Sequence, residues 1–188
     1  MKIAITGHTG GIGRAFFKIL KLRGHNVVGI SRREGENIRR IEHTANLIES
    51  CDFFINNAQS MYAQTELLYA VWEKWQGKKE KYIWNISTQM VEQPINTCPD
   101  NQDDLTMSQY RNRKLALEEA SRQLKFKNQW PQISIIRPGG VATQEKFDNS
   151  NKADVDVWAN SIVDMFSHNE NIIISEISVG HTKKRIPI

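Results

Sequence analysis

The chain has 188 residues, and its 25 Lys and Arg against 21 Asp and Glu give a formal net charge of +4 at pH 7. Hydrophobic residues make up 39% of it and charged residues 24%, which excludes disordered, collagen-like and disulfide-scaffold proteins. Since domains typically contain about 100 to 200 residues, we expect one domain over residues 1–188.

Apolar runs alternate with helical patterns along the chain. The predicted strands cover residues 3–5, 26–30, 52–56, 82–86, 133–136 and 172–175. The predicted helices cover residues 15–22, 62–77, 107–126 and 154–167. Residues 31–50 are harder to assign, with a short strand near 38–41 and a helical turn or more at 44–49. Strands that are apolar on both faces predict an α/β, doubly wound Rossmann-type domain, with a mostly parallel sheet and helices on both faces.

Other partner classes are disfavoured by where particular residues lie. The basic residues are scattered and several lie close to carboxylates, so we expect no nucleic-acid partner. Cys51 and Cys98 form no Cys-x-x-Cys pair, and the histidines never reach metal-ligand spacing, so we expect no metal and a reducing compartment. The sequence has no signal-peptide pattern and no membrane-length apolar stretch, so we expect a cytoplasmic protein without a membrane partner.

A glycine-rich segment, Thr-Gly-His-Thr-Gly-Gly-Ile-Gly at residues 6–13, follows the first predicted strand and opens the first helix. Glycines let the backbone turn tightly and approach a pyrophosphate, and the start of the helix attracts its negative charge. An ordinary strand-to-helix turn is the alternative, but the position within a βαβ unit favours dinucleotide binding. The expected contacts are Gly7, Thr9, Gly11, Ile12 and Gly13.

Two arginines stand where the second predicted strand ends. An acidic residue at this place holds the ribose 2′-hydroxyl of NAD, whereas an arginine accommodates the 2′-phosphate of NADP. Arg32 and Arg33 therefore favour NADP as the cofactor, with NAD less favoured. A solvated basic turn is the alternative, and the neighbouring Glu34 keeps it open.

Tyr110 and Lys114 are four residues apart on a predicted helix and so project from one face. A phenol is a poor acid or base near neutral pH, but an adjacent ammonium stabilises the phenolate and lowers the pKa of the phenol. The two side chains can therefore exchange protons in a reaction. Taken alone, such a pair is common by chance, and a solvent-exposed helix face is its default interpretation.

Five segments, in order, resemble motifs of the short-chain dehydrogenase/reductase family. They are the glycine-rich segment at 6–13, Asn-Asn-Ala-Gln at 56–59, Asn-Ile-Ser-Thr at 85–88, Tyr-Arg-Asn-Arg-Lys at 110–114 and Arg-Pro-Gly-Gly-Val-Ala-Thr at 137–143. The resemblance implies an NADP(H)-dependent oxidoreductase that interconverts a carbonyl and an alcohol on a small-molecule substrate. It also implies a homodimer or homotetramer.

The resemblance assigns roles to individual residues. Tyr110 would be the acid in the reductive direction, and Lys114 would lower its pKa and hold the nicotinamide ribose. Thr88 would hydrogen-bond the substrate oxygen, with Ser87 as the alternative, since alternation along a strand lets only one of them face the site. Further cofactor contacts, beside the adenosine ribose and the nicotinamide, would be Asn57, Ala58, Pro138, Gly139, Val141 and Thr143.

Several features depart from the family pattern. Gln59 replaces a glycine, and the family's helix asparagine, which holds a proton-relay water, has no clear counterpart. The 22-residue separation of Thr88 and Tyr110 is closer to members that act on nucleotide sugars. A catalytically weak NADP-sensing binding protein and a minimal relative of nucleotide-sugar epimerases or reductases are therefore the alternative functions.

Three further segments have open interpretations. The short polar segment 144–152 occupies the place of the substrate-covering loop and predicts a shallow site. In the connector 94–109, acidic residues either line the entrance or lead into the next helix. These residues are Asp100, Asp103 and Asp104. An apolar stripe at helical spacing indicates core, and part of it could form a subunit interface. Its members are Leu67, Leu68, Val71, Trp72 and Trp75.

Overall fold

A computed structural model describes residues 1–92, 104–143, 151–167 and 172–180. Its centre is a six-stranded sheet in the order β2-β1-β3-β4-β5-β8, and every pairing is parallel. The strands are β1 (Lys2–Thr6), β2 (Asn26–Ile30), β3 (Phe53–Asn56), β4 (Tyr82–Ile86), β5 (Gln132–Pro138) and β8 (Glu176–Val179). The two-residue strands β6 (Val141–Ala142) and β7 (Ala153–Asp154) form a separate pair.

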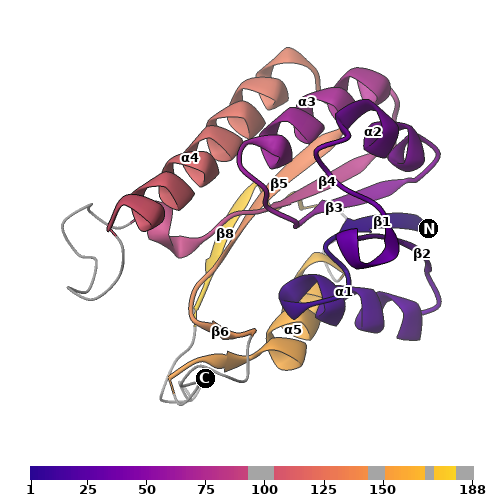
Figure 1. Cartoon of the computed structure of the whole chain (residues 1–188). Coiled ribbons are helices and arrows are strands. Elements are labelled where there is room, and N and C mark those ends of the chain that lie inside the picture. Colours follow the sequence, from indigo (N-terminus) through magenta and orange to yellow (C-terminus); the bar gives the residue numbers. More distant parts are fainter. Residues whose placement is uncertain (93–103, 144–150, 168–171, 181–188) are drawn as a thin grey trace.

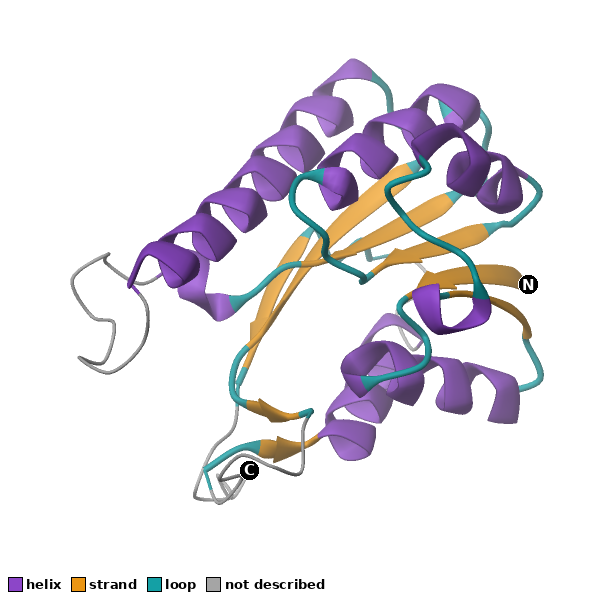
Figure 2. Ribbon diagram, viewed as in Figure 1, coloured by secondary structure: helices purple, strands orange, loops and turns teal. Residues whose placement is uncertain are grey.

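Helices cover both faces of the sheet (Figures 1 and 2). One face carries α2 (Ile41–Glu49), α3 (Ala63–Trp75) and α4 (Asp104–Lys127), and the other carries α1 (Gly11–Leu22) and α5 (Val155–Ser167). Two short 3₁₀ turns, η1 (Arg32–Glu34) and η2 (Gln89–Glu92), follow β2 and β4. The predicted doubly wound α/β fold with a parallel sheet is confirmed.

The core has two layers because successive side chains of a strand point to opposite faces. Phe54 of β3 packs in the layer beneath α2, α3 and α4, while its neighbours Phe53 and Ile55 pack in the layer that α1 and α5 cover. Strands buried on both faces read as continuous apolar runs, which is why they could be recognised in the sequence. The α3 stripe is at most 8% exposed, so the interpretation as core is confirmed and the stripe offers no surface to a second subunit.

The predicted strand near residues 38–41 is wrong. Asn37 closes a turn there, because its side-chain oxygen accepts the N–H of Arg39 at 3.0 Å and its carbonyl accepts that of Arg40 at 2.9 Å. Ile41 then begins α2. Because residues 38–41 form no strand, the strand that follows β2 along the chain is β3. Gln59 therefore comes after the third strand in sequence order.

The last strand is also displaced from its predicted position, from 172–175 to Glu176–Val179. The prediction rested on the apolar residues Ile172 and Ile173, but these are 65% and 57% exposed. β8 instead pairs with the carboxyl half of β5, where Glu176 lies opposite Ile135 and forms an ion pair with Arg137. A charged contact between distant residues thus stabilises the observed register of this strand.

None of the helices in the described part of the chain combines the length and apolarity that a membrane span requires.

Candidate active site

The candidate site residues gather at the carboxyl edge of the parallel sheet, where ligands bind in doubly wound folds. The glycine-rich loop follows β1, the two arginines follow β2, and Asn57 and Ala58 follow β3. Thr88 follows β4, and residues 138–143 lie at and after the end of β5. Tyr110 and Lys114 reach the same edge from the first half of α4.

The glycine-rich loop is fastened to the end of β3. Thr6 Oγ1 accepts the N–H groups of Asn57 at 2.9 Å and Ala58 at 3.0 Å, and Asn57 Nδ2 donates to the Thr6 carbonyl at 2.9 Å. Gly7 has a φ of +74° and Gly11 one of +50°, values that favour glycine. A Cβ at Gly13 would lie 2.4 Å from the Gly7 carbonyl oxygen. The loop is therefore a cradle of bare backbone, which fits a dinucleotide pyrophosphate.

Gly13→Ala is expected to lower the free energy of unfolding by about 1–3 kcal/mol, because the added methyl group forces packed backbone apart. Gly10→Ala is the matched control, since a Cβ there meets nothing within 4 Å and the residue has an extended φ of −157°. We expect that change to cost less than about 1 kcal/mol. Urea unfolding of both variants measures the difference, and equal losses would contradict the close packing at Gly13.

The turn after β2 lies against the glycine-rich loop. Ser31 Oγ accepts the N–H of Arg33 at 3.3 Å and lies 2.7 Å from Thr9 Oγ1, with which it shares a hydrogen bond. Arg33 also donates from its guanidinium to the Thr9 carbonyl at 3.4 Å. Both Arg32 and Arg33 are exposed at the rim of the site. Their guanidinium groups are thus accessible beside the loop.

Glu34 is the acidic residue beside the two arginines of this turn, and its side chain contacts a histidine. Its Oε2 lies 3.1 Å from His8 Nε2. The His8 ring is buried against Gly29, where a Cβ would come within 2.4 Å of the imidazole. The carboxylate is therefore engaged with the loop, and the two arginines are left as the charged groups on the open side of η1.

The segment after β5 closes back onto the glycine-rich loop. Gly139 donates its N–H to the Val179 carbonyl at 2.9 Å, and a Cβ on it would come within 2.3 Å of Gln89 Oε1. Val141 is buried, and the Thr143 side chain lies 3.3 Å from where a Cβ on Gly11 would stand. The structure therefore brings residues 138–143 and 6–13 to one crevice, although more than a hundred residues separate them in sequence.

Tyr110, Lys114 and Glu118 follow one another at intervals of four on the buried face of α4. The Tyr110 hydroxyl lies beside the Thr88 side chain, and Lys114 Nζ lies 5.7 Å from the centre of the Tyr110 ring. Ser87 is buried and donates to Glu118 Oε1 at 2.6 Å. Of the two hydroxyl residues at the end of β4, Thr88 is therefore the one beside Tyr110.

The pKa values of this pair are set mainly by burial. Burial raises the pKa of Tyr110 above its usual value of 10, and the hydrogen bond from Thr88 opposes this only in part. Burial lowers the pKa of Lys114 to about 7, with Glu118 opposing the change. In this arrangement burial outweighs any lowering of the Tyr110 pKa by the neighbouring ammonium, and that role of Lys114 stays a prediction.

Gln64, at the start of α3, is a site residue that the sequence analysis missed. Lys114 Nζ donates to Gln64 Oε1 at 2.9 Å and to the Ile86 carbonyl at 2.7 Å. The sequence did indicate this residue. Gln64 lies three residues before Leu67 and four before Leu68, so it shares the buried face of α3 with them. A polar residue in an apolar stripe indicates a buried hydrogen-bonding role.

Some predicted features lie outside the described residues. They include Asp100, Asp103 and most of the covering segment 144–152, while the Asp104 side chain is not described either. Within the described ranges, no group of three or more His, Cys, Asp or Glu side chains could hold a metal ion.

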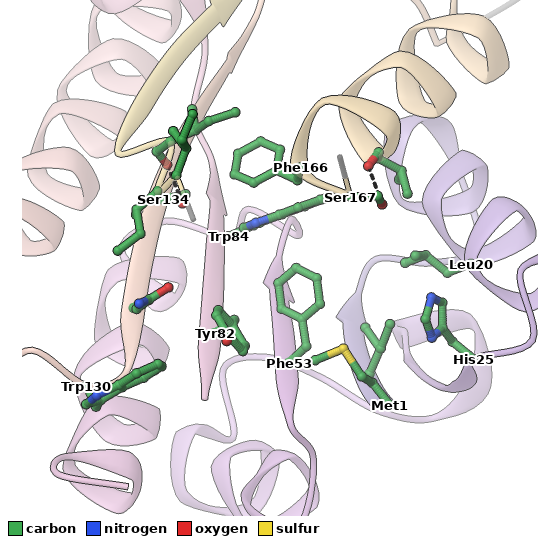
Figure 3. A pocket seen from close by; sticks show the side chains of 16 residues that line it. Met1, Leu20, His25, Phe53, Tyr82, Trp84, Trp130, Ser134, Phe166 and Ser167 are labelled. Carbon is green, nitrogen blue, oxygen red and sulfur yellow. Dashed lines mark hydrogen bonds between the residues drawn. The ribbon is translucent and has the colours of Figure 1, made fainter. Parts of the chain in front are cut away.

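A separate pocket of about 600 Å³ opens at the opposite, amino-terminal edge of the sheet (Figure 3). Phe53, Tyr82 and Trp84 of the strands line it together with Trp130 and Phe166. The length of the strands separates it from Tyr110 and the glycine-rich loop. This pocket is therefore not part of the candidate active site.

Comparison with known proteins gives a family match over the amino-terminal third of the chain. The model of the "NAD dependent epimerase/dehydratase family" matches residues 3–66, which hold the glycine-rich loop and the end of β3. No curated protein sequence matches the chain.

Solved structures resemble the whole chain. An alcohol dehydrogenase from the archaeon Thermococcus sibiricus, complexed with 5-hydroxy-NADP, is 14% identical with a TM-score of 0.71 over 100% of both chains. A 3-alpha-hydroxysteroid dehydrogenase from Pseudomonas sp. B-0831, complexed with NADH, is 16% identical with a TM-score of 0.71 over 95% of both chains. A short-chain dehydrogenase/reductase from Vibrio parahaemolyticus is 17% identical with a TM-score of 0.70, over 94% of this chain and 98% of that one. The chain therefore has the fold of these solved dehydrogenases, and its residues 3–66 match the model of the epimerase/dehydratase family.

Proposed function

We propose that the chain is an NADP(H)-dependent oxidoreductase that interconverts a carbonyl and an alcohol on a small-molecule substrate. The observation that carries the proposal is the Tyr110 hydroxyl beside the Thr88 side chain, with Lys114 one turn along the helix of Tyr110, at the edge of a backbone cradle for a pyrophosphate. Similarity to dehydrogenases complexed with 5-hydroxy-NADP and NADH supports a nicotinamide cofactor.

The cofactor residues divide by the part of the dinucleotide that each would hold. Gly7, Thr9, Gly11, Ile12 and Gly13 would hold the pyrophosphate, and Arg32 and Arg33 the 2′-phosphate. Asn57 and Ala58 would lie along the adenosine ribose. The nicotinamide would lie beside Pro138, Gly139, Val141 and Thr143, with Lys114 on its ribose.

Tyr110 would protonate the substrate oxygen, and Thr88 would hydrogen-bond to it. When bound, the cofactor supplies the hydride, and the protein supplies position and protons. The Tyr110 hydroxyl donates its proton to the carbonyl oxygen as that oxygen gains negative charge, and the Thr88 hydroxyl holds the same oxygen in place. Because burial raises the pKa of Tyr110, the phenol stays protonated at neutral pH. This state suits proton donation, and so carbonyl reduction.

Arg32→Ala and Arg33→Ala are each expected to weaken NADPH binding by about 10- to 100-fold, because a hydrogen bond to a charged group contributes about 1.5–3 kcal/mol. NADH binding should change little, since NADH has no 2′-phosphate. Titration of the fluorescence of the five tryptophans measures both affinities.

Arg23→Ala is the control for net charge, because Arg23 pairs with Asp164 at the far end of α1. It should leave both affinities unchanged. Equal weakening of NADPH and NADH by the Arg32 and Arg33 variants would argue against NADP recognition at this turn.

A second candidate is a cofactor-sensing binding protein with slow turnover. Two of the three donors of the Lys114 ammonium are engaged by Gln64 and Ile86, which leaves fewer for the reaction. Tight NADPH binding without oxidation of NADPH across a panel of aldehydes, ketones and nucleotide sugars would favour this candidate over the enzyme.

A further inference from the structure

Gln64 occupies a buried position between three elements of the site. It is 2% exposed and lies at the start of α3, between the ends of β3 and β4 and the Lys114 side chain of α4. Its Nε2 donates to the Asn56 carbonyl at 2.6 Å and to the Ile86 carbonyl at 3.1 Å. The backbone carbonyl of Gln64 accepts a hydrogen bond from Asn56 Nδ2 at 2.9 Å.

These contacts fix the orientation of the Gln64 amide. An amide carries two donors on nitrogen and acceptor sites on oxygen. Because both donors face carbonyl oxygens, Oε1 must face the Lys114 ammonium, which it meets at 2.9 Å. The opposite orientation would set the NH₂ group against the ammonium and the oxygen against two carbonyls. The amide is thus a rigid acceptor for Lys114.

The Lys114 ammonium is correspondingly constrained. It is 3% exposed, and its contacts with Gln64 and the Ile86 carbonyl use two of its three N–H groups. The third has no hydrogen-bond partner among the described residues, and the Tyr110 ring centre lies 5.7 Å from Nζ. Removing the Gln64 acceptor would both free the direction of the ammonium and remove one of the two contacts that stabilise its charge.

We propose that Gln64 is a positioning residue of the site, which aims the Lys114 ammonium at the crevice and stabilises its charged form. The kinetic part of this inference rests on the proposed oxidoreductase function. The structural part concerns Lys114 alone and is independent of that function.

Other groups around Lys114 bear on its charge. On its own helix these are Glu118, which favours the ammonium, and Tyr110, which is neutral near pH 7. Arg137 of β5 pairs with Glu118 and offsets its charge. From α3 and from the ends of β3 and β4, the facing groups are the neutral Gln64 amide and the Ile86 carbonyl. Since burial has brought the Lys114 pKa to about 7, a lost acceptor moves a titration that is measurable near neutral pH.

The test uses two substitutions at Gln64 and a control on the same helix. Gln64→Met keeps the length and removes the acceptor, whereas Gln64→Glu adds a negative charge. Gln76→Met is the control, because Gln76 is exposed at the other end of α3. The pH titration of the Lys114 side chain is followed by NMR in lysine-labelled protein, with the signal assigned by Lys114→Arg.

We expect the Lys114 midpoint to fall by about one pH unit in Gln64→Met and to rise by about one to three in Gln64→Glu, with no change in Gln76→Met. An unchanged midpoint in the Gln64 variants would overturn the inference. If Gln64→Met does not fold, Gln64→Glu decides alone: a raised midpoint supports the inference and an unchanged one overturns it.

The kinetic readout separates positioning from a structural role. With an aldehyde that the wild type reduces, kcat/KM should fall as pH rises through the Lys114 midpoint, because the ammonium is the working form. That alkaline limb should move with the midpoint in each variant, and a stationary limb would overturn the positioning role. A wild type that reduces no carbonyl would instead refute the proposed function, while the NMR titration would still decide what Gln64 does to Lys114.

Discussion

Tyr110→Phe is expected to lower kcat for NADPH-dependent carbonyl reduction by about 10²- to 10⁴-fold, which is the usual contribution of a positioned acid. The change removes the hydroxyl that lies beside Thr88 and leaves the ring near Lys114. NADPH binding should be nearly unchanged, since the glycine-rich loop and the arginines are untouched. Steady-state rates and fluorescence titration measure the two effects separately.

Tyr69→Phe is the matched control for this experiment. Tyr69 is 40% exposed on α3, so its hydroxyl lies in solvent and its loss should leave kcat unchanged. Retained turnover in Tyr110→Phe would remove Tyr110 from the proton transfer. Loss of NADPH binding together with turnover would show that the residue acts on the cofactor and not on the substrate oxygen.

The pH dependence of carbonyl reduction follows from the two pKa shifts together. A phenol with a raised pKa is a proton donor over the whole neutral range, so its own titration should not limit reduction below about pH 10. The group that titrates near pH 7 is Lys114. A fall in the reductive rate near neutral pH would therefore report the lysine, whose state depends on Gln64.

Local features of the site could be predicted from the sequence because they depend on neighbouring residues. The glycine-rich loop requires positive φ values and a bare Cα at Gly13, and only glycine supplies both. Tyr110 and Lys114 share a helix face by spacing alone. These features would be the same in any chain that folded this segment after a buried strand.

Features that depend on long-range contacts could not be predicted in this way. Alternation lets only one of Ser87 and Thr88 face Tyr110, and the partner that Ser87 finds instead is Glu118, on a distant segment. The observed place of β8 is stabilised by Arg137, which pairs with Glu176. No periodicity within a segment records such a partner, because the pairing residues lie 31 and 39 positions apart.

The same ion network is where we expect the largest loss of stability. Arg137 is 8% exposed and donates to both oxygens of Glu118, at 2.8 and 2.7 Å, and to Glu176. Glu118 is 1% exposed and also binds Arg122 and Ser87. A carboxylate at this depth requires its partners, because water cannot replace them.

Arg137→Met is expected to lower the free energy of unfolding by about 3–5 kcal/mol, because it leaves the buried Glu118 carboxylate without its main partner. Arg23→Met removes an arginine from a more exposed pair with Asp164 and should cost less than about 1 kcal/mol. Glu118→Gln added to Arg137→Met should recover part of the loss, since the unpaired charge is then gone. Denaturant unfolding of the single and double variants gives these differences, and an Arg137→Met loss no larger than that of Arg23→Met would show that the network contributes little.

The pH dependence of the same variants tests the charge pairing separately. Arg122 and Arg137 hold the pKa of Glu176 at about 2, below its usual value of 4.5. The contribution of Glu176 to stability is therefore present above pH 4.5 and is lost as the pH falls towards 2. Arg137→Met removes one of these partners and should make unfolding less sensitive to pH over this window. Parallel acid-unfolding curves for the wild type and the variant would mean that Arg122 alone sets the Glu176 pKa. The cost of Arg137→Met would then come from Glu118, which also accepts the Ser87 hydroxyl while Thr88 lies beside Tyr110.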